Sequence, residues 1–256
     1  MSDNYGYLDG EENRRVLEYY QDYQKKYAGA PRDSDKVIIG IVETLKNEME
    51  TGLKLLDIGC SSGNLLKHLK QAIFGLELTG GDLVADQIER NNENPALTGI
   101  RFERMDILNL EVREFFDVIT VNAMVYALTG EQFQDAMINI ASALNPGGHI
   151  ILFDFFHPFP QEIKVTQKTM LYPDGHSYSM RSFASAKETL ENSGFSGVEF
   201  FPFKISVDLP KDEKAEPVLS HTVGSGDERL IFHGSIFLPW CHVVAKLPSK
   251  IRSGNT

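Results

Sequence analysis

The stretch LLDIGCSSGNLLKHL, residues 55–69, decides the fold. An apolar run that contains one acid, Asp57, leads into small residues between Gly59 and Gly63 and then into an amphipathic helical pattern. A phosphate-binding P-loop would end in Gly-Lys-Ser/Thr, whereas Asn64 follows Gly63, and the spacing G-x-G-x-x-G of a dinucleotide turn is absent. The turn is therefore expected to hold another kind of ligand.

Strand and helix patterns alternate on both sides of this turn. Apolar strands are predicted over 53–59, 76–82, 100–107, 115–123 and 147–156, with helices over 64–73, 84–94 and 130–144 between them. Strands this apolar are typical of a parallel sheet that is covered on both faces. The fold class is predicted to be doubly wound α/β.

The remaining segments are expected to surround that core within a single domain, 1–256. Helices over 11–27 and 34–49, the second with Ser34 or Asp35 as its N-cap, would form an N-terminal cap of residues 1–50. A hairpin is expected within 157–181, a helix over 182–193, a strand over 197–205 and a last strand over 236–247. The insertions 157–181 and 204–235 are predicted to be lids over the substrate.

Composition limits the partners. The 256 residues are 42% hydrophobic and carry a formal net charge of −11, which disfavours nucleic acid because an acidic surface repels phosphates. No apolar run approaches the about 20 residues that span a bilayer. The two cysteines lie far apart, no His/Cys cluster has zinc spacing, and the first residues lack a signal-peptide pattern. A cytoplasmic protein without a metal site is expected, and its oligomeric state is left open.

The turn Asp57-x-Gly59-x-Ser61-x-Gly63 resembles motif I of the class I S-adenosylmethionine-dependent methyltransferases, with Ser61 in place of the usual middle glycine. Small residues let the backbone approach the ligand closely, and the acid complements a cationic sulfonium cofactor. The resemblance implies a seven-stranded, mostly parallel sheet whose last strand is antiparallel.

Later segments match the same family in order. Asp82 resembles the acid that accepts hydrogen bonds from the ribose, Asp106 the acid at the adenine, and Asn122 the end of strand four beside the ligand. The resemblance covers roughly residues 52–200 and the last strand. The cofactor-binding residues that it implies are Asp57, Gly59, Cys60, Ser61, Gly63, Asn64, Asp82, Leu83, Met105, Asp106, Ile107, Asn122 and Ala123.

The methyl acceptor is expected beyond the carboxyl ends of the strands, where both insertions should meet over the cofactor. A pocket walled in this way suits a small molecule with a hydroxyl or amine. A hydroxyl needs a base, for which His157, directly after strand five, is preferred over His221 and His233. The predicted substrate-binding residues are Tyr20, Tyr23, Tyr126 and Asp154.

Two alternatives use the same fold. An aminopropyl transferase would need acids placed to hold a polyamine, and no such run is seen. The second is a regulatory protein that binds the cofactor without catalysis, because fold alone does not determine function; the intact cofactor site and the large lids favour the enzyme.

Overall fold

The computed structural model describes residues 23–49, 52–168, 175–210, 220–226, 229–233 and 236–249. Most of the helix expected over 11–27, including Tyr20, lies outside these residues. The helices are α2 (Asp33–Asn47), α3 (Asn64–Ala72), α4 (Ala85–Glu93), α5 (Gly130–Ala143) and α6 (Phe183–Asn192). The strands of the main sheet are β1 (Leu53–Ile58), β2 (Leu76–Asp82), β3 (Arg101–Arg104), β4 (Phe116–Asn122), β5 (Leu144–His157), β8 (Ser196–Pro202) and β12 (Trp240–Lys246).

The main sheet has the order β3-β2-β1-β4-β5-β12-β8. Neighbours from β3 to β5 pair in parallel, and β12 is antiparallel to both β5 and β8. This arrangement confirms the predicted doubly wound sheet of seven strands with an antiparallel last strand. The order reverses between β1 and β4, which is where ligands bind in open sheets of this kind.

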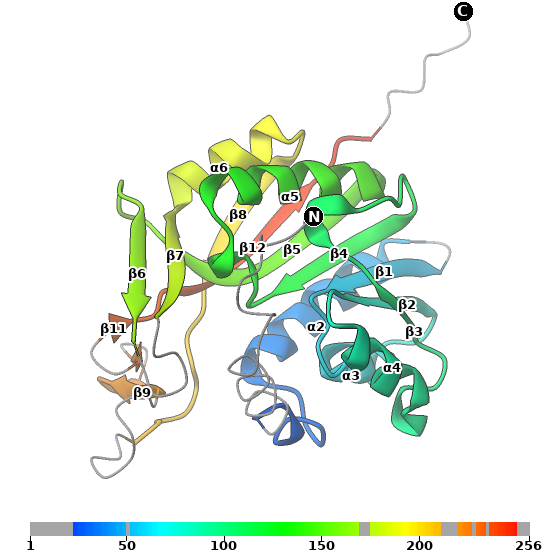
Figure 1. Ribbon diagram of the computed structural model, residues 1–256, viewed down its shortest axis with the longest axis horizontal. Coiled ribbons are helices and arrows are strands. Elements are labelled where there is room, and N and C mark those ends of the chain that lie inside the picture. The colour runs from blue at the N-terminus through cyan, green and yellow to red at the C-terminus, as the bar shows by residue number, and fades with distance from the viewer. Residues whose placement is uncertain are drawn as a thin grey trace, which may run out of the picture.

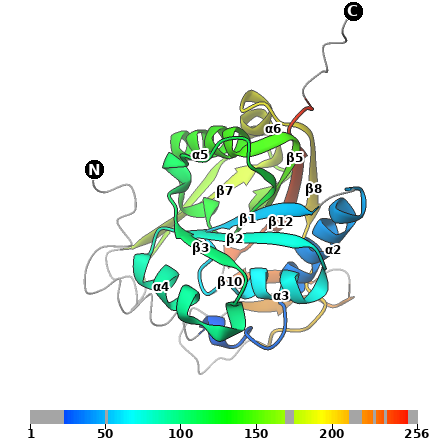
Figure 2. The same ribbon diagram turned by 90° about the vertical axis from the view of Figure 1, so that its right-hand side faces the viewer.

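Helices cover both faces of the sheet, with α5 and α6 on one side and α2, α3 and α4 on the other (Figures 1 and 2). Each face has its own apolar core, one built around Phe133 and Met137 of α5 and the other around Ile38 of α2 and Leu66 of α3. The expected N-cap of α2, Ser34 or Asp35, is corrected by two or three residues. Arg32 is the N-cap, and Asp35, in the first turn, accepts the backbone N–H of Arg32 at 3.2 Å.

The two insertions form additional strands beside the carboxyl end of β5 (Figure 1). As predicted, the first contains an antiparallel hairpin, β6 (Ile163–Gln167) with β7 (His176–Ser182), and β7 also pairs with the end of β5. The second holds a small antiparallel sheet of β9 (Ser220–Val223), β10 (Leu230–His233) and β11 (Ile236–Phe237). The single last strand expected over 236–247 is thus divided, with β11 before Pro239 and β12 after it.

Among the residues that the structure describes, no helix is both long enough and apolar enough to cross a lipid bilayer.

Candidate functional site

The turn between β1 and α3 has the backbone conformation of a ligand cradle. Gly59 and Gly63 have φ angles of +77° and +72°, and Ser61, where the family usually has glycine, has φ +46°. A Cβ atom on Gly59 would lie 2.9 Å from the Met124 sulfur, so a side chain here would have to displace Met124 as well as adopt a strained positive φ. Two hydrogen bonds hold Ser61 in its left-handed conformation: its N–H donates to the Asp82 carboxylate at 2.8 Å, and its carbonyl accepts the Asn91 amide N–H at 2.6 Å.

Asp57 lies near the end of β1, just before the turn, and its carboxyl is buried. Its side chain is 3% exposed, and its Oδ1 accepts the hydroxyl proton of Thr120 at 2.7 Å. Burial raises the pKa of this carboxyl to about 7, since removal from water penalises the charged form. A cationic ligand above the turn would favour the carboxylate again. Nearby, the buried Ser62 hydroxyl has no hydrogen-bond partner among the described residues, as expected of a cradle that a polar ligand completes.

Asp82 ends β2 beside the turn. Its two carboxylate oxygens accept the backbone N–H groups of Ser61 and Val84 at 2.8 and 3.0 Å, which fixes the carboxylate in one orientation. Burial raises its pKa, although these N–H groups act in the opposite direction. Asp106 caps the short helix 107–109 by accepting the Leu108 N–H at 2.9 Å, and Ile107 is buried. The predicted ribose and adenine acids therefore lie after neighbouring strands.

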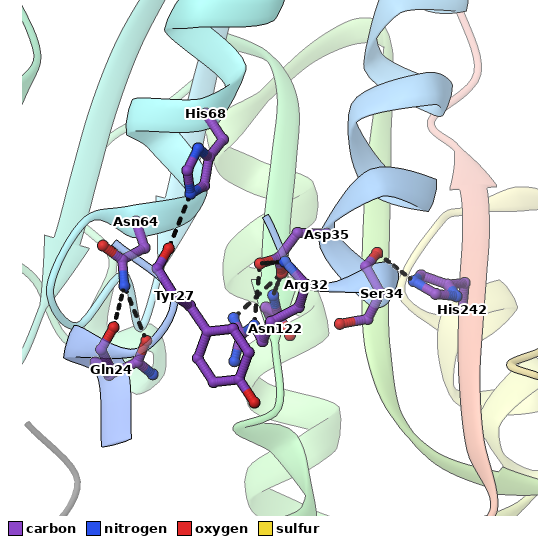
Figure 3. A network of polar contacts seen from close by, with 9 residues as sticks. All are labelled: Gln24, Tyr27, Arg32, Ser34, Asp35, Asn64, His68, Asn122 and His242. Atoms are coloured by element: carbon purple, nitrogen blue, oxygen red, sulfur yellow. Dashed lines mark hydrogen bonds and ion pairs between the residues drawn. The ribbon is translucent and has the colours of Figure 1, made fainter. Parts of the chain in front are cut away.

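The N-terminal segment is tied to the cofactor turn and to β4 by polar contacts (Figure 3). Asn64, at the start of α3, donates to the Gln24 backbone carbonyl at 2.9 Å, and the His68 ring contacts the Tyr27 carbonyl at 3.0 Å. The Asn64 amide, which was expected to bind the cofactor, is thus engaged by the N-terminal segment. This segment is thereby held against the first turns of α3.

The first turn of α2 reaches the end of β4. The Arg32 guanidinium binds both oxygens of Asp35, from Nε to Oδ2 at 3.0 Å and from Nη2 to Oδ1 at 3.2 Å. Asp35 is fully buried, and its Oδ1 also accepts the amide N–H of Asn122 at 3.1 Å (Figure 3). The next residue, Ala123, has φ +55°, which turns the chain sharply away from β4. Both Asn122 and Ala123 line a cavity.

That cavity has a volume of about 590 Å³ and opens between the N-terminal segment, the ends of β4 and β5, and both insertions. Its walls are mainly aromatic and aliphatic. The aromatic lining residues include Tyr27, Tyr126, Phe153, Phe155, Tyr178 and Trp240. The Phe153 and Trp240 rings are stacked, with 4.7 Å between centroids and 10° between planes. A flat apolar molecule would find complementary surfaces here.

The structure brings three of the predicted acceptor-side residues to this cavity: Tyr23, Tyr126 and His233. His221 does not line it; the ring is buried and stacked on Phe232. Asp154 is also outside the lining, because its carboxylate accepts the backbone N–H groups of Met124, Tyr126 and Phe155. A substrate-binding role for Asp154 stays a prediction, and the contacts seen here use its oxygens to hold the loop after β4.

His157, the preferred base, is likewise not brought to the cavity. It is the last residue of β5 instead of the first loop residue, because the strand continues and pairs with Ser182 of β7. The ring is 3% exposed and lies 5.9 Å from Phe159, centroid to centroid. Neither ring nitrogen has a hydrogen-bond partner among the described residues.

Several lining residues were not anticipated from the sequence. Arg32 and Tyr27 come from the N-terminal segment, His176 and Tyr178 from β7, and Trp240 from the start of β12. The His176 and His233 rings are half-buried, and burial lowers the pKa of each, so both are neutral near pH 7. The sequence contains one signal for the two residues of β7. His176 and Tyr178 lie two positions apart on a predicted hairpin strand, so their side chains share one face of it.

Comparisons with known proteins agree with this geometry. A family model described as "Methyltransferase domain" matches residues 21–199. A malonyl-[acyl-carrier protein] O-methyltransferase of Acetivibrio thermocellus is 24% identical over 220 residues, covering 82% of this chain and 75% of that protein. A carboxy-S-adenosyl-L-methionine synthase of Helicobacter pylori is 29% identical over 161 residues, covering 59% of this chain and 65% of that protein.

Solved structures share the fold at low identity. A methyltransferase from Methanosarcina mazei has a TM-score of 0.57 at 15% identity, covering 81% of this chain and 98% of its own. One from Mesorhizobium loti has a TM-score of 0.52 at 20% identity, covering 79% and 95%. With the cofactor cradle after β1, the acids after β2 and β3 and the matching family model, the chain belongs to the methyltransferase domain family as a class I S-adenosylmethionine-dependent methyltransferase.

Proposed function

We propose that this methyltransferase acts on a small, neutral, largely apolar molecule, most simply an aromatic one, that bears a hydroxyl or an amine. The observation that carries the proposal is the cavity beside Asn122, whose walls are built mainly from aromatic and aliphatic side chains. Such walls favour apolar ligands, and a few polar groups among them orient the reacting atom.

The charges of the cavity argue against an ionic acceptor. Among the described residues that line the cavity, Asp33 is the only acid and Arg32 is the only lysine or arginine. Arg32 is bound to Asp35, and Asp33 accepts hydrogen bonds from Lys36 at 2.7 Å and Ser206 at 2.8 Å. Burying a charged ligand without an opposite charge would be costly. An anionic acceptor and a polyamine are both disfavoured for this reason.

Histidines in the cavity supply the proton acceptor that a hydroxyl would require. His233 extends from β10, and its Nδ1 lies 3.2 Å from the Ser220 hydroxyl of β9. In the tautomer whose Nδ1–H donates to the Ser220 oxygen, Nε2 carries no hydrogen and can take a proton from the acceptor as its oxygen attacks the methyl carbon. The cofactor supplies the activated methyl group, and the protein aligns the acceptor with it.

The test is to incubate the protein with S-adenosylmethionine and three acceptor sets, and to quantify S-adenosylhomocysteine. The sets are neutral phenols and anilines, the corresponding benzoates, and short polyamines. Turnover of phenols or anilines at least tenfold above the other sets is expected. Preferential turnover of benzoates would contradict the proposal and point to an acid acceptor, as the name of the malonyl-[acyl-carrier protein] O-methyltransferase suggests for that relative. No binding to DNA or RNA at physiological salt is expected, given the net charge of −11.

A further inference from the structure

Two buried oxygens at the cavity, the Tyr178 hydroxyl and Oδ1 of Asn122, have no hydrogen-bond partner among the described residues. Asn122 is the last residue of β4, and its Oδ1 can only accept. Asn122 lines the cavity. A buried acceptor without a donor is costly in a folded protein, so such an atom indicates a ligand that supplies the missing proton.

The orientation of this amide is fixed by chemistry. The Asp35 carboxylate 3.1 Å away can only accept, so the Asn122 group facing it must be the amide N–H. The carbonyl oxygen of the same amide then points away from Asp35. A flipped amide would place two acceptor oxygens against each other.

Asp35 is itself immobilised. Arg32 binds it through both guanidinium contacts and through the backbone N–H, and the carboxylate is fully buried. Bidentate pairs of this kind have a defined geometry. The Arg32 guanidinium also lies 5.6 Å from the centroid of the Tyr27 ring, which is another part of the cavity wall. Arg32, Asp35 and Asn122 thus form one rigid chain of contacts (Figure 3).

We propose that Asn122 Oδ1 accepts a hydrogen bond from the O–H or N–H of the bound methyl acceptor before methyl transfer, and that Arg32 and Asp35 are positioning residues that hold this oxygen toward it. A hydroxyl donates its single proton to Asn122 in the bound state and gives it up to the histidine base only as its oxygen attacks the methyl carbon. The inference rests on the proposed function. Asn122 is paired in register with Phe153 of β5, whose ring stacks on Trp240, so the oxygen lies at the edge of the aromatic wall. A hydroxyl on a ring lying along that wall can reach it.

The contact makes the site selective for molecules that still carry the proton. After transfer to a hydroxyl, the product is an ether and has no proton for Asn122. Product should therefore bind more weakly than substrate, and an acceptor analogue that is already methylated should be rejected.

Trp240 offers a direct measurement, because it is the only tryptophan in the chain and lines the cavity. Its fluorescence would be titrated with 4-iodophenol and with 4-iodoanisole, in which iodine is the quencher and the hydroxyl is replaced by a methoxy group. S-Adenosylhomocysteine at saturation fills the cofactor site and cannot donate a methyl group. In the wild type, 4-iodophenol is expected to bind at least tenfold more tightly than 4-iodoanisole.

Two variants test the chain of contacts. Asn122→Leu keeps the approximate size but removes the acceptor, and should bring the ratio of the two dissociation constants close to one by weakening the phenol. Asp35→Asn should do the same, because its new amide N–H can pair with the Asn122 oxygen. Glu43→Gln neutralises an exposed acid of the same helix and should keep the wild-type ratio. Calorimetric binding of S-adenosylhomocysteine verifies that each variant is folded.

Three results would overturn the inference. Equal binding of both probes by the wild type would show that the hydroxyl is not recognised, while leaving the apolar acceptor intact. Asn122→Leu with tenfold weaker S-adenosylhomocysteine binding and an unchanged probe ratio would assign Asn122 to the cofactor. Absence of quenching by either probe would overturn the proposed aromatic acceptor and this inference with it.

Discussion

Ser34 and His242 are separated by 208 residues, yet Nε2 of His242 lies 3.1 Å from the backbone carbonyl oxygen of Ser34. A carbonyl can only accept, so the proton resides on Nε2. The ring is 1% exposed and lies 4.4 Å from Phe153, centroid to centroid. Burial lowers its pKa to about 4, which keeps the ring neutral. The last strand therefore holds the first turn of α2 over the end of β4.

Replacement of His242 by Phe should loosen this turn. The Ser34 carbonyl loses its donor, and we expect unfolding in urea at pH 7.5 to become easier by about 1–3 kcal/mol. The unfolded histidine titrates near 6.5 and the folded one near 4, so stability contributed by the neutral ring is present above pH 6.5 and is lost as pH falls toward 4. The difference between wild type and variant should shrink over that range. A difference that is constant with pH would contradict this account.

His233 is the residue whose loss should affect turnover most directly. His233→Gln keeps a hydrogen-bonding side chain but no base, and kcat with a phenolic acceptor should fall by about 10²-fold. Affinity for S-adenosylmethionine, measured by calorimetry, should stay within threefold because the residue lies on β10, away from the turn after β1. An unchanged kcat would direct attention to His176, the other half-buried imidazole of the cavity.

Substitution of His157 should leave catalysis intact. Because its ring is buried against Phe159 and does not line the cavity, kcat and KM of His157→Gln should each stay within twofold of wild type. Thermal unfolding measures the packing change separately. A fall in kcat of tenfold or more, with the melting temperature unchanged, would restore His157 to the mechanism.

Asp82→Ala should weaken the cofactor site. The substitution removes the oxygens that hold the N–H groups of Ser61 and Val84, so the left-handed turn and the expected ribose contact are lost together. Binding of S-adenosylhomocysteine should weaken at least tenfold by calorimetry. Asp82→Asn keeps one acceptor oxygen and should show a smaller loss. Wild-type affinity in both variants would remove Asp82 from the cofactor site.

The fold was predictable because its signals are local. Apolar strands, the small residues after β1 and the Ser182 cap of α6 are each contained within about fifteen residues. The small sheet of β9, β10 and β11 is not predicted from the sequence because its strands are only four or two residues long, and Ile236–Phe237 of β11 reads as the start of the last strand. Asp35 is predicted as a possible N-cap, whereas it lies three residues after the N-cap Arg32, accepts the Arg32 N–H, and has its other oxygen buried against Asn122.

The residues of the site also fall into a group with a local sequence signal and a group that only the tertiary fold brings together. Residues of the cofactor turn follow one another in sequence, so a motif finds them. The cavity joins Tyr27, Asn122, His176, His233 and Trp240, whose proximity depends on how the insertions fold back. His157 illustrates the limit: chain order places it next to the reacting centre, but pairing of β5 with β7 extends the strand and buries the ring elsewhere.

The pKa of Asp57 makes cofactor binding depend on pH. Burial raises this pKa to about 7 in the folded protein, against about 3.9 in an unfolded chain. In the cofactor-free protein the protonated form is therefore favoured, so the contribution of Asp57 to stability is complete below about pH 4 and is lost as pH rises to 7. The sulfonium cation of S-adenosylmethionine favours the carboxylate, so binding should expel a proton and strengthen as pH rises from 6 to 8.

Calorimetry in buffers of different ionisation enthalpy measures that proton release. We expect a fraction of one proton released per S-adenosylmethionine bound at pH 7, and a smaller fraction for S-adenosylhomocysteine, which lacks the sulfonium charge. Asp57→Asn keeps the size of the side chain and one acceptor for the Thr120 hydroxyl, and should release none from this position. Equal proton release by wild type and Asp57→Asn would show that the ligand does not act on this carboxyl, since no other change separates the two proteins.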